Sequence, residues 1–186
     1  FQHQNPAVNL NIEINDRFVD LVGEGFDMAL RIGVLADSSL IARKLAVLPM
    51  VICGSPEYLQ LAGLPADPGE LASHRCLLYG KEGLHGWNLP VQGKNQLFPV
   101  KGPVSSNNGE VLRESAEAGL GLALLPRFIV EEAIQAGRLM PVLADYTPPG
   151  LTLNAMYPQH RQHSPVIRAL LSFISEHISS EPVRKG

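Results

Sequence analysis

The sequence predicts an α/β protein, because two kinds of segment alternate along it. Short apolar runs typical of β-strands recur throughout the chain, and stretches with apolar residues at helical spacing lie between them. The clearest helical stretch begins at Ser164 and Pro165, two residue types that favour a helix start. Its apolar residues share one face: Ile167, Leu170, Leu171, Ile174 and Ile178. Such alternation is typical of largely parallel sheets flanked by helices.

The first two strands are predicted on either side of one short helix. Val8 to Ile14 alternates apolar and polar residues, which predicts a half-buried strand. Asp16 can cap a short helix after it. Phe26 to Gly33 predicts the second strand, with Arg31 beside its carboxyl end. Together these segments are expected to form a compact β-α-β unit.

The middle of the chain predicts further helices and a second set of strands. Helix starts are predicted at Ser55 with Pro56 and at Asp67 with Pro68, where a capping side chain precedes a proline in the first turn. From Arg75 onward, apolar runs separated by glycine and proline predict the strands of a second lobe. The remaining predicted elements are an extended segment at 40–53, strands at 87–89, 97–100, 139–143 and 151–157, and a helix at 129–134.

The stretch from Ser105 to Phe128 predicts a strand, a helix and a second strand, and it supplies the first candidate site. Asn107 and Glu110 have the spacing of a capping box, so a helix is expected to begin there. A helix start at the carboxyl end of a strand presents backbone amides, here of residues 108–110, which attract anions or carbonyl oxygens. The alternative is that the cap only prevents fraying and that the glycines only let the helix lie close to a sheet.

Composition limits the classes of function. The 186 residues carry a net charge of −3, with a pI near 6.1 and no stripe of basic residues, so this chain is a poor candidate for gripping DNA itself. No apolar run approaches the roughly 20 residues of a membrane helix. Cys53 and Cys76 lie in apolar surroundings, which predicts buried reduced thiols and fits a cytoplasmic location.

No pattern of catalytic or cofactor-binding residues is found in the sequence. Only His160 and His163 of the six histidines lie close together, and no cysteine or carboxylate completes a zinc-ligand set around them. The G-L-G of residues 119–121 follows a predicted helix instead of opening one, which excludes a dinucleotide site. We therefore expect no metal, no cofactor and no enzymatic activity.

Six stretches, in their order and spacing, resemble the effector-binding domain of LysR-type transcriptional regulators. They are D-M-A-L-R-I-G (27–33), D-S-S-L-I-A-R-K-L (37–45), C-G-S-P-E-Y-L (53–59), L-A-S-H-R-C-L (71–77), A-G-L-G-L-A-L-L-P (118–126) and G-R-L-M-P-V-L (137–143). The resemblance extends over nearly the whole chain.

The resemblance implies a two-lobe fold like that of type 2 periplasmic binding proteins. Each lobe would be a mostly parallel sheet flanked by helices, with crossovers near Pro49 to Ser55 and Asn154 to Pro158. Lobe I would comprise residues 1–52 and 157–186, and lobe II residues 53–156. Two family features have no counterpart in the sequence: the amino-terminal winged helix-turn-helix, and the first strand of lobe I with most of its helix. We therefore expect a fragment in which Val8 to Ile14 does not pair directly with residues 26–32.

The resemblance also implies that a small, anionic effector, for example a carboxylate, binds between the lobes near strand ends of both. Transferred position by position, the candidate ligand-binding residues are Asn15, Asp16, Arg31, Ile32, Gly33, Ser105, Asn107, Asn108, Leu125 and Pro126. The planar guanidinium of Arg31 suits a carboxylate. A solvent-facing or salt-bridged Arg31, paired with Asp27 or Asp37, stays open as the alternative.

The implied partners are the effector and further copies of the chain, in a homodimer or a higher oligomer. The outer edge of Val8 to Ile14 and the helix after Asn107 would meet the partner, and DNA would be bound only through the missing amino-terminal domain. The resemblance implies no membrane partner.

A secreted solute-binding protein of a transporter is the alternative function. The motif at 37–45 and the cysteines argue against it. A third possibility is an enzyme with the same two lobes, for which the candidate catalytic residues are only Asp16, Arg31 and the histidines.

Overall fold

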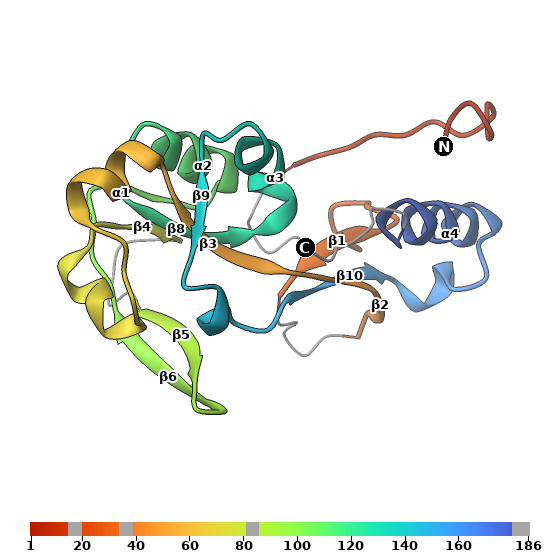
Figure 1. Cartoon of the computed structure of the whole chain (residues 1–186). Helices are drawn as coiled ribbons and strands as arrows, with labels where there is room; N and C mark the ends of the chain where they lie inside the picture. The colour runs from red at the N-terminus through yellow and green to blue at the C-terminus, as the bar shows by residue number, and fades with distance from the viewer. Residues whose placement is uncertain (15–19, 34–38, 81–85, 180–186) are drawn as a thin grey trace. The chain divides into compact units, whose positions relative to one another are not determined.

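The structure is a computed structural model that describes residues 1–14, 20–33, 39–80, 86–179 (Figure 1). The strands are β1 (Ala29–Ile32), β2 (Ile41–Leu48), β3 (Met50–Gly54), β4 (Cys76–Tyr79), β5 (Gly86–Val91), β6 (Lys94–Pro99), β7 (Ser105–Ser106), β8 (Leu122–Pro126), β9 (Met140–Val142) and β10 (Leu151–Tyr157). The α-helices are α1 (Pro56–Ala62), α2 (Gly109–Glu117), α3 (Arg127–Gln135) and α4 (Pro165–Ser179). Short 3-10 helices are η1 (Pro68–Ser73), η2 (Ala144–Tyr146) and η3 (Gln159–Arg161). The predicted α/β class is confirmed.

The chain forms two compact units. The first consists of Phe1–Val47 and Leu151–Gly186, and the second of Leu48–Gly150. The chain therefore passes from one unit to the other twice, just before β3 and just before β10. The lobe boundaries given above, 1–52 with 157–186 and 53–156, stay a prediction.

The first unit is built on a three-stranded sheet in the order β1-β10-β2. β1 runs antiparallel to β10, with Leu30 opposite Ala155 and Arg31 opposite Asn154. Helix α4 covers one face of this sheet. Its buried core contains Ala155, Tyr157, Ile167 and Leu171, with Met28, Ile41 and Leu45 packed around them. The apolar face predicted for this helix thus packs against the sheet, and burial of this face stabilises the helix.

The strand predicted at Val8 to Ile14 is wrong. This segment forms no strand, and Ile12 and Ile14 are 74% and 95% exposed. A strand needs a neighbour to pair its backbone groups, and no described strand lies beside this segment, so its alternating pattern has nothing to pack against. It does not pair with β1, which pairs with β10 in the described part of the chain. The expected β-α-β unit is therefore not formed, and Asp16, its predicted cap, lies outside the described residues.

The second unit is built on a five-stranded sheet in the order β7-β4-β8-β3-β9. β4 runs parallel to β7 and β8, whereas β3 runs antiparallel to both β8 and β9. The expectation of mostly parallel sheets is therefore corrected: the sheet of the second unit is mixed, and β1 and β10 of the first unit are antiparallel. Parallel neighbours need a crossover connection, whereas β3 and β10 each enter their sheet directly after the chain passes from the other unit.

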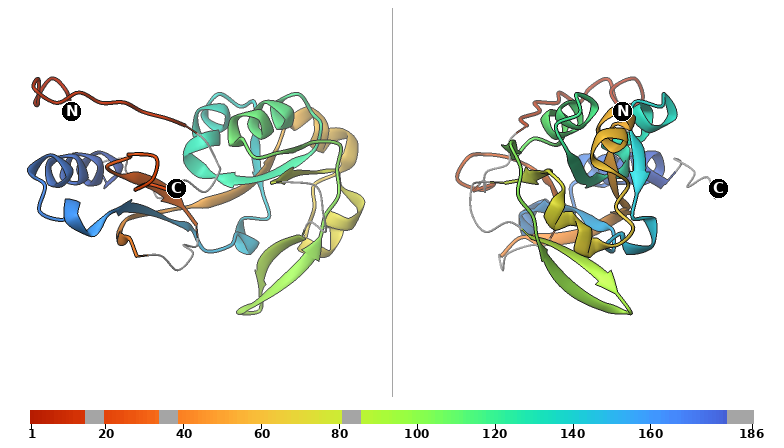
Figure 2. Two further views of the ribbon diagram at one scale, coloured as in Figure 1. Left: turned by 180° about the vertical axis from the view of Figure 1, so that it is seen from behind. Right: turned by 60° about the vertical axis from the view of Figure 1, so that its left-hand side comes forward.

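Helices and loops cover both faces of this sheet, so its core has two layers. On one face α2 and α3 pack on the sheet, as Figures 1 and 2 show from two sides. The buried residues of this layer are Val51, Cys53, Leu77, Leu112, Ala116, Ala123, Leu125, Val130, Ala133 and Leu139. On the other face α1, η1 and the β5–β6 hairpin enclose a second layer around Ile52, Leu71, Leu89 and Leu122. A sheet buried on both faces explains the continuous apolar runs of β3, β4 and β8.

The glycines after α2 have separate roles. Gly119, at φ 75°, takes the left-handed conformation that ends the helix. A Cβ atom at Gly121 would lie 2.4 Å from the carbonyl oxygen of Arg75, so only glycine lets the chain enter β8 beside β4.

Both cysteines are free and buried, as expected from their apolar surroundings. Cys53 lies in β3 and Cys76 in β4, each 0% exposed. Burial raises the pKa of each thiol to about 12. Because the thiolate is the reactive form, these thiols are inert packing groups.

A hydrogen-bonded cluster of Tyr58, His74 and Arg75 links α1 to the start of β4. The backbone amide of Arg75 donates to Tyr58 Oη at 2.9 Å, and Tyr58 Oη lies 3.0 Å from His74 Nδ1. The phenol has one hydrogen, which it can donate to Nδ1 in the neutral tautomer of His74 that carries its proton on Nε2. Burial lowers the pKa of His74 and so favours this neutral form, although the nearby charge of Glu70 acts in the opposite direction. The Arg75 guanidinium donates onward to the Gly119 carbonyl at 3.0 Å.

This cluster makes the stability of the second unit sensitive to acid. Because the pKa of folded His74 is lowered below 6.5, the unfolded chain takes up the proton first, so the free energy of unfolding falls as pH drops below that value. Urea denaturation at a series of pH values between about 5 and 8 measures this slope. His74→Asn keeps an acceptor near the position of Nδ1 but does not titrate, and it should flatten the slope. Identical slopes in both proteins would contradict the assignment.

Candidate functional site

The candidate ligand-binding residues belong to both units. In the second unit they lie on β7, at the start of α2 and at the end of β8. β7 pairs in parallel with β4 at one edge of the sheet, with Ser105 opposite Leu78. The hydroxyl of Ser105 donates to the carbonyl of Gly80 at 2.5 Å, which links β7 to the residue that follows β4.

The N-cap of α2 is Asn108, and the capping box predicted for Asn107 and Glu110 is wrong by one residue. Asn108 has the extended backbone of a cap, with φ −110° and ψ 119°. Its Oδ1 accepts from the amides of Glu110 and Val111 at 2.8 and 3.4 Å. The exposed Asn107 precedes the cap, and Glu110 forms an ion pair with Arg113 at 2.9 Å. The spacing was read correctly as a helix start, but two adjacent asparagines cannot be told apart by spacing alone.

This capping decides which amides of the helix start stay available to a ligand. Oδ1 of Asn108 takes up the Glu110 amide, and the Ser106 hydroxyl accepts from the Asn108 amide at 3.0 Å. Within the described residues the Gly109 amide has no such side-chain partner. Gly109 itself lies close to α3, since a Cβ atom there would meet Ile129 Cδ1 at 2.6 Å. Much of the helix start is therefore occupied by the protein's own groups, as the alternative interpretation held.

Leu125 and Pro126 end β8 opposite Val51 and Met50 of β3. The side chain of Leu125 is 0% exposed and belongs to the core beneath α2 and α3. Pro126 is also buried, and the amide of the next residue, Arg127, donates to the Pro49 carbonyl at 2.7 Å. The structure thus places both residues in the packed end of the sheet, and their role as ligand contacts stays a prediction.

In the first unit Arg31 and Ile32 form the end of β1, and Gly33 follows them. Arg31 is half-buried, and Gly33 has a φ of 101°, a conformation that favours glycine. The Gly33 amide donates to the Thr152 carbonyl at 2.9 Å, which keeps the strand end beside β10. Asn15 and Asp16, the other candidates in this unit, lie outside the described residues. Asp27, considered as a partner of Arg31, forms an ion pair with Arg161 at 2.7 Å.

Asn154 is a polar residue at this site that the sequence interpretation missed. It lies opposite Arg31 in β10 and is only 7% exposed. Its Nδ2 lies 3.5 Å from the Gly33 carbonyl and 3.4 Å from the Thr152 carbonyl. The sequence contains one indication of its importance, which is an amide side chain within the otherwise mostly apolar run L-T-L-N-A-M-Y. A buried polar side chain is normally hydrogen-bonded, so its presence in such a run points to a specific partner.

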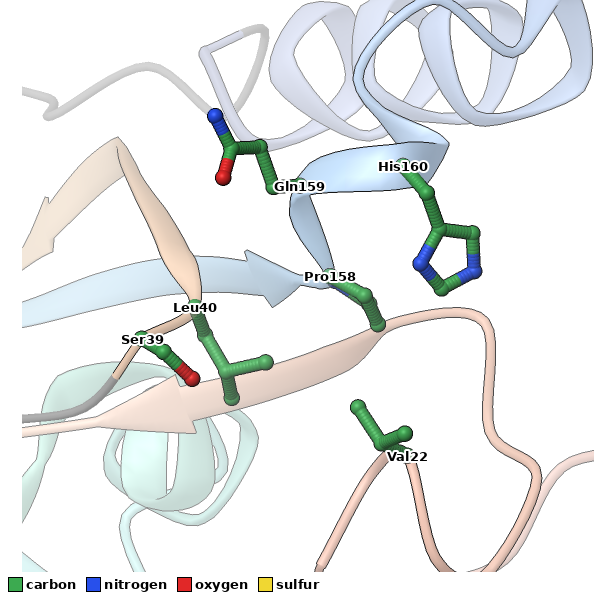
Figure 3. A pocket seen from close by; sticks show the side chains of 6 residues that line it. All are labelled: Val22, Ser39, Leu40, Pro158, Gln159 and His160. Carbon is green, nitrogen blue, oxygen red and sulfur yellow. The ribbon is translucent and has the colours of Figure 1, made fainter.

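Two open hollows lie elsewhere on the surface. One, of about 510 Å³, lies in the first unit, where the apolar side chains of Val22, Leu40 and Pro158 face a common space (Figure 3). Ser39, Gln159 and His160 complete its rim. The other, of about 400 Å³, adjoins His74 and Lys101 in the second unit. Neither contains a candidate residue, so the candidate site does not coincide with them.

The described residues contain neither a cluster of metal ligands nor a membrane-spanning helix. No group of three or more histidine, cysteine or acidic side chains is placed to hold a metal ion. No helix in the described ranges is both long and apolar enough to cross a membrane.

Comparison with known proteins agrees with the resemblance. A family model described as the LysR substrate binding domain matches residues 1–179. An HTH-type transcriptional regulator of Haemophilus influenzae is 38% identical over 89% of this chain and 58% of its own length. The regulator YhjC of Escherichia coli is 36% identical over 94% of this chain and 60% of its own length. The chain thus spans less than two thirds of these relatives.

A solved structure has the same fold. The regulatory domain of CrgA, a LysR-type transcriptional regulator from Neisseria meningitidis, matches with a TM-score of 0.83 and 31% identity, over 95% of this chain and 87% of that chain. The predicted fold class, α/β with the two-lobe architecture of periplasmic binding proteins, is confirmed by this match.

The capping assignment is tested by a matched pair of variants. Asn108→Ala removes the acceptor of two helix amides and should lower the free energy of unfolding by about 1 kcal/mol. Asn107→Ala, the neighbouring control, should change it by less than about 0.5 kcal/mol because that side chain is exposed before the cap. Both values come from urea denaturation. A larger loss in Asn107→Ala would restore the capping box first predicted.

Proposed function

This chain belongs to the family of LysR substrate binding domains, and from that premise we propose that it senses a small anionic molecule for a transcriptional regulator. LysR-type regulators bind small-molecule effectors, act as oligomers and bind DNA. The relatives named above are HTH-type regulators, so the DNA-binding part of the protein would lie outside the span of this chain. The observation that carries the proposal is the family match over residues 1–179, together with the fold it shares with a solved regulatory domain.

The proposed effector carries a carboxylate, and Arg31 is its proposed partner. Arg31 is a half-buried cation at the end of β1, where the sheet of the first unit ends. A guanidinium offers two parallel N–H donors to a carboxylate, and partial burial strengthens that pairing relative to an exposed one. The position of the effector between the lobes, which the resemblance implies, remains a prediction, as do the other candidate contacts.

The oligomer is proposed to use surfaces on which apolar side chains are exposed. Leu10, Ile12 and Ile14 are exposed in the first unit, and Val111 of α2 is 45% exposed in the second. Exposed apolar side chains that lie close together mark contact surfaces. The same proposal includes a cytoplasmic protein with no catalytic role. A transport role is not favoured, because the relatives are named as transcriptional regulators.

Titration of small carboxylates into the chain tests the proposed effector class. Arg31→Ala should weaken carboxylate binding at least about tenfold, because it removes a charge-assisted pair of hydrogen bonds. Arg43→Ala is the matched control: it removes the same charge from an exposed position on β2 of the same unit and should leave the affinity unchanged. Isothermal titration calorimetry measures both. Equal affinities in the wild type and Arg31→Ala would remove Arg31 from the site, and equal losses in the two variants would indicate a general charge effect.

A further inference from the structure

The register of β1 and β10 brings Arg31 and Asn154 together within the first unit. The two residues are directly opposite in an antiparallel pair, so their side chains project from the same face of the sheet, about 5 Å apart at Cβ. Because side chains alternate between faces along a strand, this is not the face on which Ala155 and Tyr157 pack against α4. A cation and a nearly buried amide thus stand side by side on the face that α4 does not cover.

The orientation of the Asn154 amide follows from its neighbours. The two atoms near its nitrogen are the carbonyl oxygens of Gly33 and Thr152, which only accept hydrogen bonds. Nδ2 must therefore face them, and Oδ1 is the end that points elsewhere. Both contacts are long, at 3.5 and 3.4 Å, so each contributes little stabilising energy. They indicate only which end of the amide faces the two carbonyls.

Oδ1 of Asn154 is an acceptor without a donor among the described residues. In the described part of the chain, Nε of Arg113 is the side-chain atom that is both fully buried and without a hydrogen-bond partner. Oδ1 of Asn154 also lacks a partner but is not fully buried, so it keeps some contact with solvent. The residue as a whole is nonetheless 7% exposed. A largely buried acceptor with a small accessible opening favours a ligand that brings a donor, because such a donor meets little competition from bulk water.

We propose that Asn154 selects the effector by accepting a hydrogen bond from a donor on the carbon next to the carboxylate that Arg31 holds. The effector is then a carboxylate with an adjacent hydroxyl or ammonium group, a 2-hydroxy acid or a 2-amino acid. This inference rests on the proposed function and narrows it. Arg31 provides affinity for the carboxylate, and Asn154 distinguishes acids that carry the donor from acids that lack it.

Two sets of three related acids test the inference on the unmodified chain. The first set is lactate, alanine and propionate, and the second is mandelate, phenylglycine and phenylacetate. In each set the members carry a hydroxyl, an ammonium group or no donor beside the carboxylate. In one set at least, the hydroxy or the amino acid should bind about tenfold more tightly than the acid without a donor, as expected for one buried hydrogen bond. Which of the two binds more tightly identifies the source of the donor.

Variants then assign the discrimination to Asn154. Asn154→Leu removes the acceptor and keeps the same branched arrangement of side-chain heavy atoms, and it should reduce the ratio to within about twofold while leaving the affinity for the acid without a donor unchanged. Asn154→Thr provides a second, smaller replacement suited to a strand. Met156→Leu, on the same face of β10, is the packing control and should keep the wild-type ratio. Thermal denaturation verifies that each variant folds.

The failures of the two proposals are distinguishable. If propionate and lactate bind equally, phenylacetate and mandelate bind equally, the amino acids gain nothing, and Arg31→Ala abolishes all binding, the carboxylate proposal stands and the role of Asn154 is overturned. A tenfold preference that persists in Asn154→Leu also overturns it. If none of the six acids binds to the wild type, both the carboxylate effector and the role of Asn154 are overturned.

Discussion

Antiparallel pairing of one strand is the constraint on which each unit depends. β10 pairs with β1 in the first unit, and β3 pairs with β8 and β9 in the second. Each of these strands begins just after the chain passes from one unit to the other. Such pairing joins segments that are remote in sequence, as in the contact between Asn154 and Gly33, which are 121 positions apart. The candidate site of the first unit exists only because this register is held.

Local signals predicted the elements whose stability is local. Residue types and spacings within a few positions predict three of these features. They are the apolar face of α4, the start of α1 at Ser55 and Pro56, and the succession of α2 and β8. The α/β class followed from these signals, whereas the family was inferred from the resemblance of six longer stretches. The position of the cap at Asn108 was missed by one residue because neighbouring asparagines offer the same oxygen, and only the backbone conformation distinguishes them.

Features that depend on a distant neighbour could not be predicted. Val8 to Ile14 has a strand pattern without a strand, because pairing requires a second segment that spacing does not reveal. The strand directions and the position of Asn154 beside Arg31 have the same origin, since both depend on register between remote segments. Arg31 became a candidate because a charge within an apolar strand is conspicuous in the sequence, whereas one amide side chain in β10 is less so. Leu125, a position transferred by resemblance, has a core side chain, and its role as a ligand contact stays a prediction.

The unpaired segment from Val8 to Ile14 has a consequence for how the chain behaves in concentrated solution. It combines alternating β-branched and aliphatic residues with one charge, at Glu13, and no proline. Short segments of this composition stack between molecules into fibrils when no fold shields their backbone. A neighbouring strand that paired with this segment would therefore protect the chain against aggregation.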